Sequence, residues 1–352
     1  MKARITGLIV LIAVIVTAIG YTLYQKNSYT EEIKGYVGGE KIGLLEDEEV
    51  QKVLKDKYHL KINYYKAGSL DMVTEDKSGM DFLFPSSATA LELYEQNYGK
   101  PEKSEIILNT PLVIYTHQAV LDTLEKQGIA STTDDIHYVD MTKLLQCVEE
   151  EKSWSDIGLP QLYGTVSIGT TDPTKSNSVN MFAGLIAYTL TKGTVNSSSI
   201  GDVLPRIQQI FTRLGYMETS SADIFSQFLK MGMGAKPMIV GYESQILEFA
   251  CENPDDWTQL KDDIVMLYPD PTVWSSHIYI ALDNAGEQGI DALLDPSIQK
   301  IAWEKHGFRT GVSSDKMDVS RFDVPGVLQQ VTRVAPMPDA ETMLKILSAL
   351  EG

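Results

Sequence analysis

The strongest constraint in this sequence is an uncharged run that extends from Ile5 to Tyr24. A helix of this length rises about 1.5 Å per residue and so crosses the roughly 30 Å hydrocarbon core of a bilayer. Lys2 and Arg4 precede the run, and positive charge on a short flank favours keeping that end in the cytoplasm. We therefore expect residues 1–25 to form a single-pass anchor in the cell membrane, with a soluble extracytoplasmic domain after it.

A cleavable signal peptide is the alternative interpretation of the same run. The apolar region of a signal peptide usually has about 7–15 residues, and no small-x-small cleavage site follows the run here. No cysteine lies near its end, which excludes a lipid-anchored lipoprotein. Whether the segment is cleaved stays open, but both alternatives export the remainder of the chain.

The exported part is strongly acidic. Twenty-seven of the 30 basic residues and all 48 acidic residues follow Lys26, which leaves a net charge of −21 on residues 27–352. Binding to a phosphate backbone needs basic stripes, so nucleic acid is excluded as a partner. Such a surface keeps a domain soluble, and we expect a monomer.

After a polar tether at residues 26–33, the sequence repeats a strand–turn–helix pattern. Predicted strands in LKINYYKAG, DFLF and IILNTPLVIYT are each followed by turn residues or a helical segment, and a single long helix is predicted over Lys41 to Tyr58. The pattern returns in TVSIGTTDPTKSNSVNMFAGLIAYTL and PMIVGYESQILEFA. This alternation is typical of a parallel sheet covered by helices, so the fold class is α/β.

Three loops that follow predicted strands are rich in hydroxyl groups and open directly into helices. Backbone N–H groups at a helix start carry a partial positive charge, and hydroxyl groups can donate beside them. In open parallel sheets such loops line the crevice where ligands bind. N-capping, which contributes about 1 kcal/mol without any ligand, accounts for any one loop alone. The residues are Ser69, Ser86, Ser87, Asp172, Thr174, Ser176 and Ser178.

The ordered series of motifs resembles the type II periplasmic-binding-protein family, in its branch of molybdate-, sulfate- and related bacterial extracellular solute-binding proteins. The motifs are KAGSLDMV, DFLFPSSATA, TTDPTKSNSVNMFAGLIA, MIVGYESQILE, VMLYPDPTVWSSHIYIAL and IQKIAWEKHGFRTG, which span most of the chain from about Lys41 to Thr310. The resemblance implies two α/β lobes joined by two crossover strands near residues 106–116 and 266–281. It implies a first lobe of residues 34–112 and 275–352, and a second of residues 113–274.

The resemblance also implies which residues contact the ligand in the cleft between the lobes. Ser69 and either Ser86 or Ser87 would contribute from the first lobe. The loop from Asp172 to Ser178, together with Tyr242 or Glu243, would contribute from the second. Glu243 and Asp172 depart from what an anion site needs: Glu243 either points away or repels an anion, and Asp172 precedes proline and can simply shape the turn.

Other chemistries find little support. The five histidines never approach a metal-ligand spacing such as HxxxH, so neither a metal site nor a cofactor is expected. GYESQ lacks the central serine of a nucleophile elbow, and no pair of carboxylates stands out as an acid/base couple, so an enzyme is not expected. Cys147 and Cys251 either pair in an oxidising compartment or remain free thiols.

The sequence therefore predicts a membrane-tethered extracellular solute-binding protein. The resemblance implies that it captures a small solute, with an oxyanion favoured, for an ABC permease in the membrane. The alternative is a tethered sensory or accessory ligand-binding domain without a role in transport. The sequence does not identify the ligand.

Overall fold

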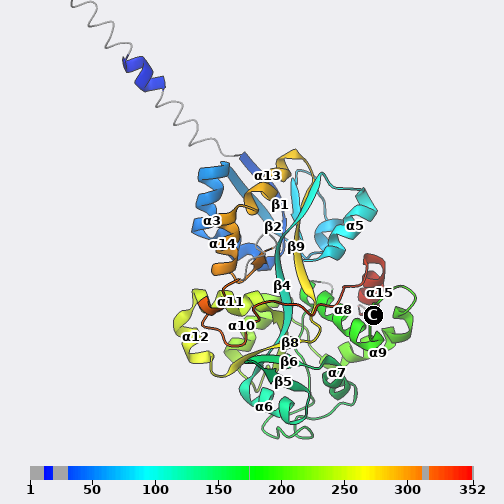
Figure 1. Cartoon of the computed structure of the whole chain (residues 1–352). Coiled ribbons are helices and arrows are strands. Elements are labelled where there is room, and N and C mark those ends of the chain that lie inside the picture. Colours follow the sequence, from blue (N-terminus) through cyan, green and yellow to red (C-terminus); the bar gives the residue numbers. More distant parts are fainter. Residues whose placement is uncertain (1–11, 19–30, 174, 311–316, 351–352) are drawn as a thin grey trace, which may run out of the picture.

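Strand β4 (Lys103–His117) runs through the centre of the molecule and pairs in two sheets (Figure 1). The computed structural model describes residues 12–18, 31–173, 175–310 and 317–350. In its first part β4 pairs with β9 (Trp274–Ala281) and β10 (Arg309–Thr310). In its second part it pairs with β7 (Met238–Tyr242) and β8 (Ile264–Pro269). The residues expected to cross between lobes thus lie in β4 and in the β8–β9 segment.

We call the sheet above this changeover, with its helices, the upper half. Its strand order is β2–β1–β3–β9–β4, with β1 parallel to both neighbours and β9 antiparallel to β3 and β4. Ile33, Gly35 and Val37 alternate as buried residues on β1. The other elements are β1 (Glu31–Val37), η1 (Gly39–Lys41), α2 (Ile42–Glu46), α3 (Glu48–Val53), η2 (Leu54–Tyr58), β2 (Leu60–Lys66), α4 (Asp71–Thr74), β3 (Phe82–Phe84), α5 (Ala88–Tyr98), α13 (Asn284–Leu293) and α14 (Pro296–Glu304).

The lower half contains the second sheet and most of the longer helices. From β4 the strand order continues through β8, β6 and β5, with β6 parallel to β8 and β7 on the other side of β4. Its elements are α6 (Gln118–Lys126), β5 (Ala130–Thr133), β6 (Ile136–Val139), α7 (Met141–Glu149), α8 (Asn177–Thr191), α9 (Ile200–Leu214), α10 (Ser221–Met231), α11 (Glu243–Glu252) and α12 (Pro254–Leu260).

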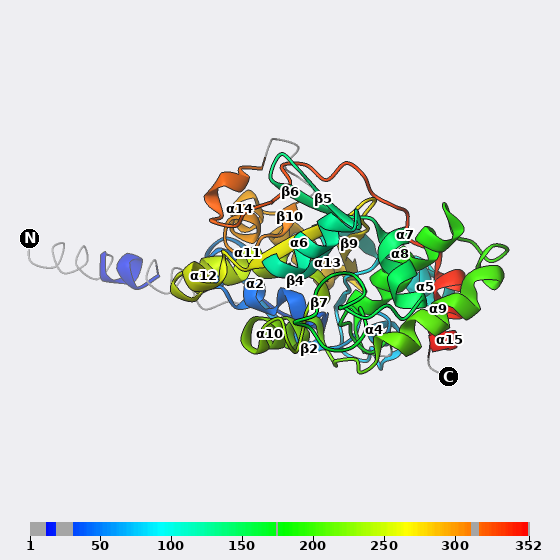
Figure 2. The ribbon, with the colours of Figure 1, turned by 90° about the horizontal axis from the view of Figure 1, so that it is seen from below.

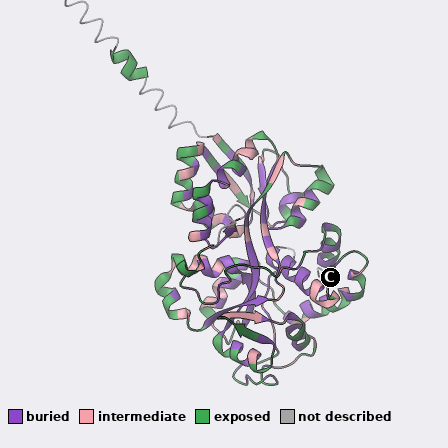
Figure 3. Ribbon diagram, viewed as in Figure 1, coloured by how far each residue is buried: buried purple, intermediate pink, exposed green. Residues whose placement is uncertain are grey.

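Each half has its own apolar core. In the upper half one cluster gathers around Ile33, Phe82 and Tyr279, and in the lower half the largest gathers around Ile114 and Phe182. The central strands are buried and the helices expose their outer faces (Figure 3). The C-terminal segment holds η3 (Val319–Arg321) and α15 (Ala340–Leu350), and α15 contacts α9, α8 and α5 (Figure 2). This last helix therefore touches both halves.

The mixed α/β fold predicted from the sequence is confirmed, but three local predictions need correction. The expected tether ends earlier, because β1 begins at Glu31 and Ile33 is fully buried. The single helix expected from Lys41 to Tyr58 is broken, because the Asp47 side chain caps a new helix by accepting from the N–H groups of Glu49 and Val50. The strand expected at the start of TVSIGTT makes only isolated bridges, at Thr165, Gly169 and Thr171.

Two further expectations concern the N-terminus and the cysteines. Residues 12–18 are helical, and the rest of the run from Ile5 to Tyr24 lies outside the described residues. Within the described part of the chain, no helix has both the length and the apolar character needed to cross a bilayer. Cys147 is a buried free thiol and Cys251 an exposed one, so the two do not pair.

Candidate functional site

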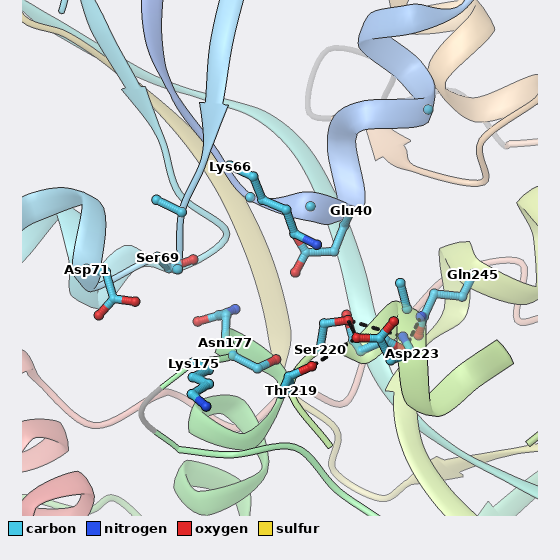
Figure 4. A pocket seen from close by; sticks show the side chains of 18 of the residues that line it. Glu40, Lys66, Ser69, Asp71, Lys175, Asn177, Thr219, Ser220, Asp223 and Gln245 are labelled. Carbon is cyan, nitrogen blue, oxygen red and sulfur yellow. Dashed lines mark hydrogen bonds between the residues drawn. The ribbon is translucent and has the colours of Figure 1, made fainter. Parts of the chain in front are cut away.

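A cavity of about 530 Å³ lies between the upper and lower halves, beside the changeover of β4 (Figure 4). From the upper half it is lined by the turn after β1 and by the segment from Lys66 to Asp71, which follows β2. From the lower half it is lined by the starts of α8, α10 and α11. The cavity is thus built from strand ends above and helix N-termini below, the arrangement in which α/β proteins hold small ligands.

Two of the three helix starts are already satisfied by the protein itself. At α10, the Ser220 side chain accepts from the Asp223 N–H, and the Asp223 carboxylate accepts from the Ser220 hydroxyl. At α11, the N–H of Ser244 donates to Thr110 Oγ1 and that of Ile246 donates to the Tyr115 hydroxyl. Helix α8 has no side-chain cap and no acidic residue in its first turn. Its start therefore offers the least compensated positive end.

The structure brings two of the predicted site residues to the cavity wall, Ser69 and Ser176. Ser69 Oγ accepts from the Ser86 N–H at 2.9 Å, and Ser176 Oγ lies 3.0 Å from Ser178 Oγ. The predicted residues Ser86, Ser87, Ser178 and Tyr242 are buried and do not line the cavity. Asp172 lies in the loop before α8, 3.9 Å from Lys175, and Thr174 lies outside the described residues.

Glu243 faces away from the cavity and forms a buried ion pair. Its two carboxylate oxygens accept from Arg309 Nε at 2.6 Å and Nη2 at 2.9 Å, and the Tyr268 hydroxyl also donates to it. Arg309 is on β10 in the upper half, whereas Glu243 begins α11 in the lower half. The charge that the sequence left unexplained is therefore neutralised, and the pair links the two halves.

A buried lysine in the upper half, next to the residues that line the cavity, was not predicted from the sequence. Lys41 Nζ is fully buried and donates to Ser86 Oγ at 2.7 Å and to His277 Nδ1 at 3.0 Å, with the Glu40 carboxylate at 3.8 Å. Burial lowers the pKa of Lys41 to about 8, although Glu40 acts in the opposite direction. Burial, with Lys41 adding, lowers the pKa of His277 well below its ordinary value. The one sequence signal is the pair Gly38–Gly39, because a Cβ at position 38 would lie 2.8 Å from Lys41 Nζ.

Nine of the other cavity residues are charged or carry amides, and the rest are glycine, alanine, serine or threonine. The nine, which the sequence did not single out, are Glu40, Lys66, Asp71, Glu75, Lys175, Asn177, Asp223, Gln245 and Glu248. Asp71 and Asn177 lie near Ser69 and Lys175, while Glu40 and Lys66 lie above Ser220 and Asp223 (Figure 4). Burial and then Glu75 raise the pKa of Asp71 above its ordinary value. Neither hydroxyl content nor helical periodicity marks these positions in the sequence.

One group among the described residues could bring metal ligands together, namely Glu248, Glu252 and His306. His306 Nδ1 lies 2.6 Å from Glu248 Oε1, and Nε2 lies 3.5 Å from the Asp47 carboxylate. The hydrogen bond between the His306 ring and the Glu248 carboxylate accounts for this geometry without an ion. The absence of a metal site thus stays a prediction.

Solved structures that resemble this one are binding proteins for chemically different solutes. An apo ferric ion-binding protein of Pasteurella haemolytica matches with a TM-score of 0.57 and 13% identity, over 91% of this chain and 96% of that one. A putative spermidine/putrescine ABC transporter of Listeria monocytogenes gives 0.57 and 15%, over 91% and 98%. The sulfate-binding protein of Mycobacterium tuberculosis gives 0.50 and 13%, over 84% and 92%. At such identities the likeness shows the fold and leaves the solute open.

Comparison by sequence adds nothing to this. No protein-family profile matches the chain. No curated protein sequence matches it either.

The ion pair between Arg309 and Glu243 gives a prediction for stability. Arg309→Met leaves the Glu243 carboxylate buried without its partner, so we expect the free energy of unfolding to fall by about 3–5 kcal/mol. Arg206→Met is a matched control, because Arg206 also binds both oxygens of a glutamate, Glu149, but half of its side chain is exposed. The control should lose at most about 1 kcal/mol. Urea denaturation of both variants measures the difference, and equal losses would contradict the structural role assigned to the buried pair.

The buried Lys41 gives a prediction for the dependence of stability on pH. Its pKa falls from 10.5 in the unfolded chain to about 8 in the folded chain, so between these values the unfolded state holds the extra proton. The free energy of unfolding therefore rises with pH across this window. Below pH 8 the folded protein bears the full free-energy cost of burying the charged ammonium group. Relative to Lys41→Met, the wild-type free energy of unfolding should increase by about 3 kcal/mol from pH 8 to pH 10.5. Denaturation curves at each pH test this, with Lys52→Met, at an exposed position of α3, as the control for removing a lysine elsewhere.

Proposed function

We propose that this chain, whose fold is that of the type II periplasmic substrate-binding proteins, binds a small solute between its two halves outside the cytoplasm. The observation that carries the proposal is the cavity of about 530 Å³, lined from both halves and beside the strand that joins them. This volume lies within the range of small-molecule sites. A solute held from both sides would favour the closed arrangement, because a ligand shifts a conformational equilibrium only by its differential affinity for the two states.

The lobe boundaries predicted from the sequence are part of this proposal, with residues 34–112 and 275–310 forming one lobe and residues 113–274 the other. Residues 317–350, predicted in the first lobe, contribute Phe322, Ala335 and Ile346 to cores of the lower half instead. The observed β1 supports extending the first lobe back to Glu31. Ser69 and Ser176 would contact the solute directly. Ser86, Ser87, Ser178 and Tyr242 would support these contacts from behind the wall, where they are buried.

We further propose that the segment from Ile5 to Tyr24 anchors the protein in the cell membrane. The solute-binding domain would then lie close to the outer surface and pass its solute to an ABC permease. The uncharged run and the preceding Lys2 and Arg4 support this arrangement. A tethered sensory domain remains the second candidate. Intact-mass measurement of the protein from membrane fractions distinguishes a retained anchor from a cleaved signal, and a permease gene beside this one would favour transport over sensing.

The oxyanion favoured from the sequence has mixed support in the cavity. The start of α8 and the hydroxyl groups of Ser69 and Ser176 can donate to an anion. Five carboxylates line the same cavity with only two lysines, which opposes an anion. The proposal that the protein binds a small solute therefore has more support than the proposal that this solute is an oxyanion.

Substitution of the two serines tests the location of the binding site. Ser69→Ala and Ser176→Ala each remove one hydroxyl group from the cavity wall, and a typical hydrogen bond contributes about 1 kcal/mol. We expect each to weaken solute binding by roughly fivefold while the protein remains folded. The measurement is calorimetric titration of the full chain with the solute that is retained during purification, identified by mass spectrometry.

Ser78→Ala is the control, because its hydroxyl is exposed on a turn and bonded only to Asp76. If both cavity variants bind like the control, the site lies elsewhere. If no solute is retained, and pools of oxyanions, amino acids, amines, sugars and peptides leave the melting temperature unchanged, the proposed function fails.

A further inference from the structure

The charges that line the cavity do not balance. Glu40, Asp71, Glu75, Asp223 and Glu248 oppose Lys66 and Lys175, which gives a formal net charge of −3. A helix N-terminus acts as roughly half a positive charge, so the starts of α8, α10 and α11 contribute about +1.5 at most. Lys41 Nζ, 3.8 Å from Glu40 and outside the lining set, brings this balance to −2, which still leaves a small negative excess after the helix ends are included. This excess favours a positively charged ligand.

The excess is concentrated near Asp71. Glu40 has Lys41 nearby at 3.8 Å, and Glu248 contacts His306. Within the described residues, no ion pair involves Asp71 or Glu75. Asp71 is exposed overall, and partial burial followed by the neighbouring Glu75 raises its pKa. A positive charge placed here would relieve this repulsion.

An independent observation on α8 indicates the kind of positive group. Asn177 is only 4% exposed, and its Nδ2 donates to the Ser86 carbonyl at 2.8 Å, which fixes the amide orientation because a carbonyl can only accept. The Oδ1 atom is then left without a hydrogen-bond partner. Figure 4 shows this oxygen turned toward the side on which Ser69 and Asp71 lie. A buried acceptor without a partner is costly, so it favours a ligand that brings a donor.

Asn180 repeats this feature one turn further along α8. Its Oδ1 also lacks a partner, and the residue lines an adjoining cavity that shares Ser69, Asp71 and Ser176 with the first. Within the described residues, Asn177 Oδ1 is the unsatisfied atom at these walls that a hydrogen bond of its own amide identifies as an acceptor.

The size of the cavity and the spacing of its acceptor atoms argue against a bare metal ion as the ligand. The one described group of histidine, cysteine or acidic side chains with three ligand atoms close enough for a metal does not include Asp71. A cavity of about 530 Å³ accommodates an organic molecule and is far larger than a single ion requires.

We propose that the cavity binds a small organic cation with N–H donors, a primary or secondary ammonium held by the Asp71 carboxylate and the Asn177 side-chain oxygen. This inference rests on the proposed function as a solute-binding protein. The ammonium group supplies both the missing positive charge and the missing donors. An alkylammonium without N–H groups supplies only the charge.

The full chain, stripped of retained solute by partial unfolding and refolding, would be titrated calorimetrically in the presence of a chelator. The probes are n-butylamine, butane-1,4-diamine, tetramethylammonium, glycine, sulfate and molybdate. We expect the two amines to bind, tetramethylammonium to bind at least tenfold more weakly than they do, and the oxyanions not to bind. Asp71→Asn, which removes one charge at constant shape, should lower amine affinity more than tenfold. Asp122→Asn, on the exposed face of α6, should change it less than twofold.

Each result bears on one claim. Binding of sulfate, molybdate or glycine without binding of amines would overturn the cationic assignment and leave the solute-binding function standing. Amine binding that Asp71→Asn does not weaken, or that tetramethylammonium matches, would overturn the assigned contacts. Failure of every probe, together with the absence of any retained solute, would sink the proposed function itself. If Asp71→Asn lowers the melting temperature, Asp71→Ser provides a second test of the same charge.

Discussion

The membership of β4 in two sheets is the constraint on which the rest of the structure depends. Because its first part pairs with β9 and its second part with β7 and β8, the two halves share one rigid strand and must meet beside it. The same strand also positions one part of the cavity wall, the start of α11. Thr110 and Tyr115, both fully buried on β4, accept the N–H groups of Ser244 and Ile246 and so fix the start of α11. Strand pairing, rather than loop chemistry, positions this part of the site.

Contacts between the halves converge on one backbone carbonyl near the same strand. Ser86 O accepts from Asn177 Nδ2 at 2.8 Å and from Ser275 Oγ at 2.9 Å. The N–H of the same residue donates to Ser69 Oγ, and its hydroxyl group accepts from Lys41 Nζ. Any movement of α8 relative to β3 must stretch the Asn177 bond, whereas the Ser275 bond lies within the upper half. The orientation of the Asn177 amide, and thus the position of its unsatisfied oxygen, is therefore coupled to the relation between the halves.

The sequence predicted the elements whose pattern is local. Strands β2, β3, β4 and β7 follow from their apolar runs and flanking turns, and the hydroxyl loops correctly marked Ser69 and Ser176 as cavity-lining positions. Strand β1 was missed because EEIKGYV is charged at one end and contains glycine. It is a strand inside the sheet only because β2 and β3 pair with it on both sides. The neutralisation of Glu243 depends on Arg309, 66 residues away, which no local pattern reveals. Asn177 and Lys41 are likewise informative only through partners brought by the fold.

Hydroxyl-rich helix starts suggested an anion in the sequence, but two of the three helix starts that line the cavity from the lower half, those of α10 and α11, were not among them. A helix N-terminus attracts an anion only while its N–H groups lack partners. At α10 the Ser220 side chain accepts the N–H of Asp223, whose carboxylate places a negative charge in the first turn, and at α11 two side chains of β4 accept N–H groups. Only α8 remains uncapped by a side chain, and its first residue presents a buried oxygen without a partner. Hydroxyl groups at helix starts therefore indicate hydrogen bonds within the cavity wall rather than a bound anion. The carboxylates without an ion-pair partner determine which charge the cavity attracts.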